Sequence, residues 1–88
     1  MKIKGTYILR EVAGSFAVVP VGATVADFNG MITLNETGAF LWQQLGEEID
    51  RDGLIERLTA EYDVTPERAA ADVDVFLHTL RENDFVTE

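Results

Sequence analysis

The first third of the chain places apolar and polar residues in short, partly alternating runs, which is typical of β-strands. Turn signals at Ala13-Gly14-Ser15 and at Asn29-Gly30 separate these runs. The runs are rich in β-branched and aromatic residues, which favour strands. The pattern therefore predicts three strands, with a candidate fourth at 23–28: residues 6–12 (TYILREV), 16–21 (FAVVPV) and 31–34 (MITL).

The remaining two thirds shows apolar residues three or four positions apart, the spacing of an amphipathic helix. Pro66 and Glu67 mark one start clearly, because proline and an acidic residue are favoured in the first helical turn. Phe85 and Val86 follow the last helix and are expected to dock back as a short tail. Three helices are predicted, each after a residue that can cap a helix N-terminus: Asn35, Asp50 or Asp52, and Thr65.

Strands followed by helices predict an α+β fold, in which a short sheet buries its apolar face against the helices. The expected arrangement is winged-helix-like, with three to four short N-terminal antiparallel β-strands followed by a three-helix bundle. A length of 88 residues predicts a single domain over residues 1–88. The chain has no cysteine, which excludes disulfides and cysteine-ligated zinc.

The acidic charge lies in one half of the chain. The formal net charge is −9, yet residues 1–43 contain three basic and three acidic side chains, so the whole excess falls in residues 44–88. Such a field repels phosphate backbones and anionic lipid and favours neutral or basic partners. No apolar run is long enough to span a bilayer. The weakly apolar stretch 12–26 resembles a signal peptide, but Glu11 adjoins it and Gly14, Pro20 and Gly22 interrupt it. We expect a cytoplasmic protein that binds neither nucleic acid nor membrane.

Candidate catalytic chemistry is sparse. His78 shares a helical face with Asp74 and Glu82, and this column favours a solvated charge ladder over a metal or acid–base site, because a metal would require further ligands. Ser15 lies in a predicted turn with no base nearby in sequence. The glycines form no phosphate-binding motif. We therefore expect no catalytic residue, no metal, no cofactor and no enzymatic activity.

The predicted strand at residues 31–34 is the candidate binding element. Natural edge strands are protected by lysine, proline or inward-facing charges, and this strand carries none of them. By contrast, Arg10 and Glu11 belong to the first strand and Pro20 to the second. An unprotected apolar edge is either covered by the protein itself or pairs with an incoming strand. The residues alone leave both alternatives open.

Three segments, in order, resemble the coenzyme PQQ synthesis protein D (PqqD) family. They are a strand-to-helix junction, a second helix with its exit, and a third helix: residues 34–42 (LNETGAFLW), 54–64 (LIERLTAEYDV) and 71–80 (ADVDVFLHTL). The similarity covers about residues 7–86. One departure is that the family joins its second and third strands tightly, whereas residues 23–29 resemble an insertion. If that insertion pairs with residues 31–34, it would occupy the edge that a peptide needs.

The resemblance implies a peptide-recognition domain for ribosomally made, post-translationally modified peptides. In such a domain the leader segment of the precursor adds as a strand to the last β-strand, beside the third helix. The domain then presents the peptide to a modifying enzyme, often a radical S-adenosylmethionine protein. Carried over to this chain, the expected peptide-binding residues are Met31, Ile32, Thr33 and Leu34 from the strand, and Ala70, Val73, Asp74 and Leu77 from the helix.

Two other interpretations are weighed against this one. A scaffold or regulatory subunit of winged-helix type would dock on a larger enzyme through its helices, and an open sheet edge would also permit a homodimer. A DNA-binding winged helix is disfavoured, because the third helix offers only Arg68 and Arg81 among many acids.

Overall fold

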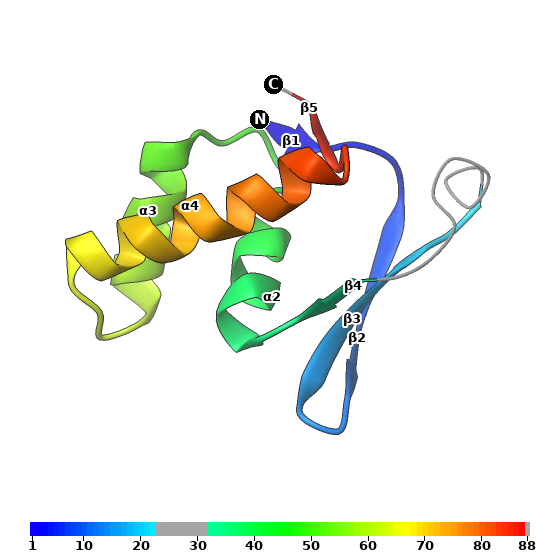
Figure 1. The fold of residues 1–88 in the computed structure, drawn as a ribbon, viewed down its shortest axis with the longest axis horizontal. Helices are drawn as coiled ribbons and strands as arrows, with labels where there is room; N and C mark the ends of the chain where they lie inside the picture. The colour runs from blue at the N-terminus through cyan, green and yellow to red at the C-terminus, as the bar shows by residue number, and fades with distance from the viewer. Residues whose placement is uncertain (23–31, 88) are drawn as a thin grey trace.

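The computed structural model describes residues 1–22 and 32–87. The helices gather on one side of the molecule, and the hairpin of β2 and β3 extends away from them (Figure 1). This arrangement confirms the predicted α+β, winged-helix-like fold. In chain order the elements are β1 (Lys2–Ile3), β2 (Tyr7–Val12), β3 (Ser15–Pro20), β4 (Ile32–Leu34), α2 (Glu36–Gln44), α3 (Arg51–Glu61), α4 (Pro66–Glu82) and β5 (Val86–Thr87).

Strands β2, β3 and β4 form an antiparallel sheet in that order. Ala13 and Gly14 connect β2 to β3 and have positive φ angles of 53° and 82°. A two-residue turn with both φ angles positive matches the right-handed twist of the flanking strands. The turn signal read from the sequence therefore marks a tight hairpin.

Strand β4 lies at the edge of this sheet. It pairs with β3 on one side, where Ile32 is opposite Val18 and Leu34 is opposite Phe16. Among residues 1–22 and 32–87, no strand pairs with its other side. Met31 and the candidate strand at 23–28, like the insertion at 23–29, lie outside the described residues.

A second, two-stranded sheet joins the two ends of the described chain, as β1 pairs with β5. The tail expected at Phe85 and Val86 does dock back, and its partner is the start of the chain. Phe85 is fully buried and makes edge-to-face contacts with Tyr7 and Trp42, with ring centroids 5.3 and 5.6 Å away. This aromatic cluster ties the beginning of β2 to α2 and so fixes the sheet relative to the helices.

Each of the described helices α2, α3 and α4 begins at a side-chain cap that the sequence predicts. The Asn35 Oδ1 atom accepts a hydrogen bond from the Gly38 N–H at 2.7 Å, and Asp50, rather than Asp52, caps α3 in the same way through Gly53. The Thr65 hydroxyl caps α4. These caps satisfy N–H groups that a helix leaves unpaired at its start. They place the beginning of α2 directly after β4.

The core lies between the inner face of the sheet and the three helices. Val18 of β3 and Leu41 of α2 are fully buried within it, as are Val73 and Leu77 of α4. Helices α3 and α4 pack against each other, and α2 contacts both β3 and β4. Helix α4 is thus held by its packing on α3 and the shared core.

Candidate functional site

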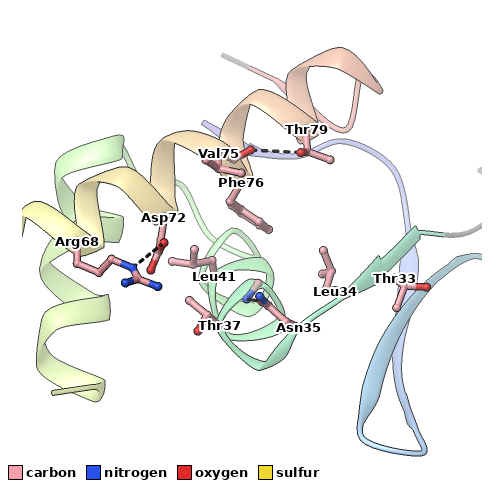
Figure 2. Close-up of a pocket in the computed structure, with 11 residues that line it drawn as sticks. Thr33, Leu34, Asn35, Thr37, Leu41, Arg68, Asp72, Val75, Phe76 and Thr79 are labelled. Atoms are coloured by element: carbon pink, nitrogen blue, oxygen red, sulfur yellow. Dashed lines mark hydrogen bonds and ion pairs between the residues drawn. The ribbon is translucent and has the colours of Figure 1, made fainter. Parts of the chain in front are cut away.

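A cleft of about 430 Å³ opens between β4, the first turns of α2 and one flank of α4. In Figure 2 the side chains of β4 and α2 form its lower wall, and α4 runs across the top. Helix α4 contributes five residues spaced so that they share one stripe along its surface: Arg68, Asp72, Val75, Phe76 and Thr79. The edge of β4 with which no described strand pairs therefore borders a hollow beside α4.

The floor of this cleft is apolar. Leu41 is fully buried, Phe76 is 7% exposed, and Leu34 is half-buried. Gly38 allows the first turn of α2 to approach β4 closely, because a Cβ atom at this position would lie 3.3 Å from the Leu34 Cβ atom. The floor offers space for an apolar side chain supplied by a ligand.

Val75 marks the rim of the cleft. Its side chain is 70% exposed, although valine is among the residues most often buried in proteins. It is one of three large apolar side chains that are exposed in the described part of the chain; the others are Ile8 and Val12. An exposed valine beside an apolar hollow enlarges the surface that a partner can bury.

One end of the cleft carries a loose ion pair. The Arg68 Nε atom lies 3.4 Å from the Asp72 Oδ1 atom, and both side chains are partly exposed. Such a pair contributes little to stability, because solvent screens it. Both groups therefore remain available to a ligand that lies along α4.

The opposite flank of α4 carries a tighter ion pair. The Arg51 Nε atom donates to the Asp74 Oδ1 atom at 2.6 Å, and a second guanidinium nitrogen donates to Oδ2 at 3.0 Å. This hydrogen bond lowers the pKa of the Asp74 carboxyl group below its ordinary value. Because the pKa of Asp74 is lowered in the folded state, the pair stabilises the fold at pH values above the ordinary pKa of an aspartate. This contribution to stability is lost as the pH falls through the lowered pKa. Asp74 thus helps to hold α4 against α3.

The residues predicted from the sequence fall into two groups. Thr33 and Leu34 line the cleft, Ile32 precedes them in β4, and Met31 lies outside the described residues. The four predicted residues of α4 do not line the cleft: Val73 and Leu77 are fully buried in the core, Asp74 pairs with Arg51, and Ala70 is half-buried. Their assignment to peptide contact stays a prediction. The flank of α4 that does face β4 is the neighbouring one, through Val75 and Phe76.

No group of histidine, cysteine, aspartate and glutamate side chains suited to a metal ion occurs among the described residues. The His78 Nε2 atom lies 3.2 Å from the Oε1 atom of Glu82, which is one helical turn later. Both side chains are exposed to solvent, which is typical of side-chain pairs on the polar face of a helix. Within residues 1–22 and 32–87, no helix is long and apolar enough to cross a membrane.

The cap of α2 gives a first testable prediction. Asn35→Ala should lower the free energy of unfolding by about 1 kcal/mol, because the Gly38 N–H loses its acceptor. Urea denaturation followed by circular dichroism measures this change. Gln43→Ala, an exposed substitution in the same helix, is the control and should change stability by less than about 0.5 kcal/mol. Equal stability of the two variants would contradict the assigned cap.

The model of the coenzyme PQQ synthesis protein D (PqqD) family matches residues 5–86. The chain belongs to the PqqD family. The resemblance read from residues 34–42, 54–64 and 71–80 is thereby confirmed. The match includes the whole of β4 and α4, and therefore the cleft between them. No match was found among curated proteins.

The fold of this PqqD-family chain is similar to that of TbiB1, whose structure was solved in complex with the TbiA(beta) leader peptide. The TM-score is 0.72, and the superposition covers 97% of this chain and 93% of the TbiB1 chain. The two sequences are 20% identical. At that identity the likeness establishes a shared fold.

Proposed function

We propose that residues 1–88 form a recognition domain that binds the leader segment of a ribosomally made precursor peptide and presents it to a modifying enzyme. The observation that carries the proposal is the edge of β4, which no strand within residues 1–22 and 32–87 covers, beside a cleft with an apolar floor. Membership of the PqqD family and the leader peptide bound to TbiB1 support it. The domain itself performs no chemistry, and the family resemblance favours a radical S-adenosylmethionine protein as the enzyme.

The proposed binding mode is β-strand addition. The outward N–H and C=O groups of β4 bond to the peptide backbone, which gives affinity that depends little on sequence. Alternate side chains of an added strand point to opposite faces, so every second residue enters the cleft. There it meets Leu34, Leu41 and Phe76, and the fit of these contacts provides selectivity.

The length of the cleft sets the length of the bound segment. From Arg68 to Thr79, α4 advances about 16 Å at the helical rise per residue. A strand of about five residues covers that distance. We therefore expect a short recognition segment within the leader, flanked by residues that remain unbound.

Charge favours a leader with basic residues near this segment. The chain carries a net charge of −9, and the excess lies in residues 44–88, which include α3 and α4. Long-range attraction raises the association rate of a basic peptide and weakens as salt is added. Ordering a flexible leader costs free energy, which offsets part of the gain from the contacts. We expect a dissociation constant in the micromolar range or lower.

Backbone NMR tests the proposal directly. The ¹⁵N-labelled protein is titrated with a synthetic leader peptide from any precursor gene found beside its own gene, and a scrambled peptide is the control. The amides of Ile32, Thr33 and Leu34 should shift most, together with those of Val75 and Phe76. Shifts confined to α3, or no shifts at all, would contradict strand addition at β4. Sedimentation of the free protein separately measures whether a second copy occupies the same edge.

A further inference from the structure

The outer face of the β2–β3–β4 sheet carries several apolar side chains, with Ser15 and Thr33 at its margins, where a solvated face would ordinarily be polar. Ile8 and Val12 of β2 point outward and are 43% and 63% exposed. The strand register places Val19 opposite Ile8, and Ala17 lies opposite Arg10 on the same face. These side chains form one patch on the side of the sheet that faces away from the helices, hereafter the outer patch: Ile8, Arg10, Val12, Ala17 and Val19.

Arg10 is the only charged side chain at the outward positions of these three strands. It is exposed, and within residues 1–22 and 32–87 it makes no ion pair or hydrogen bond through its side chain. Arg51, Arg57 and Arg68, by contrast, each pair with an acidic residue. A free guanidinium group within an apolar surface is complementary to a carboxylate group within another apolar surface.

The charge of the outer patch argues against a second copy as the occupant. Two copies joined symmetrically through the outer patch would bring two Arg10 guanidinium groups into one apolar interface. The patch itself offers no carboxylate group to meet Arg10 of the other copy. A different protein, with an acidic residue in an apolar surface, satisfies both the apolar and the charged part of the patch.

The position of the outer patch leaves the cleft free. The five residues of the outer patch belong to β2 and β3, and none of them lines the cleft, which is formed by β4, α2 and α4. A protein docked on the outer face therefore does not cover the β4 edge or the α4 wall. A peptide and a protein partner can bind at the same time, which is what presentation of a peptide requires.

We propose that the outer patch docks the enzyme that modifies the bound peptide, through an apolar surface of that enzyme that carries a carboxylate group. This inference rests on the proposed function, since it identifies the partner as the enzyme that receives the peptide. It adds a second binding surface, separate from the leader cleft, with Arg10 as its charged contact.

The test uses any peptide-modifying enzyme found encoded beside this protein's gene, purified, with binding followed by biolayer interferometry. Arg10→Glu should weaken enzyme binding at least ten-fold, and Ile8→Thr combined with Val12→Thr should have a similar effect. Lys2→Glu is the matched control, because Lys2 is an exposed cation outside the patch and the charge change is the same. The control should bind within two-fold of the unaltered protein.

Each variant is also titrated with the leader peptide, whose affinity should stay within two-fold of the original. Unchanged enzyme binding by Arg10→Glu, or no binding by the unaltered protein, would overturn the inference. A dimer in sedimentation that Arg10→Glu dissociates would also overturn it, by making a second copy the occupant. If the leader does not bind but enzyme binding still depends on Arg10, the proposed function is wrong and the docking inference stands.

Discussion

Leu77→Ala is expected to lower the free energy of unfolding by about 3 kcal/mol, which corresponds to a fall in melting temperature of about 12 to 24 °C. Leu77 is fully buried within the core cluster, and its truncation leaves a cavity that the surrounding side chains can fill only in part. Small domains are stable by only a few kcal/mol, so this loss is a large share of the total. Urea denaturation and a thermal scan measure it.

Val75→Ala is the matched comparison on the same helix. Val75 is 70% exposed, and alanine is a better helix former, so stability should change by less than about 0.5 kcal/mol. A loss below about 1 kcal/mol in Leu77→Ala would contradict its place in the core. The pair of variants separates the flank of α4 that stabilises the fold from the flank that borders the cleft.

The elements of the fold are readable from the sequence because their signals are local. Asn35 and Thr65 cap helices through side chains that bond to backbone groups three residues later, and no distant contact is needed to recognise them. The hairpin turn at Ala13-Gly14 is equally local. β1 and β5 were not predicted as a pair, because two-residue strands are too short to show a period.

The cleft can be predicted from the sequence only in part, because most of its signals are not local. Apolar periodicity identifies the buried stripe of α4, and Val73 and Leu77 belong to that stripe. Which neighbouring flank faces β4 depends on how α4 packs against α3 and the core, and this is a tertiary feature. One local signal was present: Val75 adds an apolar side chain outside the buried stripe, next to Asp74.

Val75→Gln is expected to weaken leader binding about ten-fold, which is about 1.4 kcal/mol. Burial of a valine side chain against a partner contributes about 1.5 kcal/mol or more, and glutamine loses most of this without a change in net charge. The residue is exposed in the free protein, so the fold should be unaffected. Isothermal titration calorimetry with the leader peptide measures the affinity, and circular dichroism confirms the fold.

Val12→Gln is the matched control, since Val12 is a similarly exposed valine at 63% but lies on the outer face of the sheet. Its leader affinity should stay within two-fold of the original. Equal weakening in both variants would indicate that the peptide spreads over the sheet and does not lie in the cleft. An unchanged affinity in Val75→Gln, with the β4 amides still shifted by the peptide, would leave strand addition in place. It would remove α4 as the wall that selects the side chains of the leader.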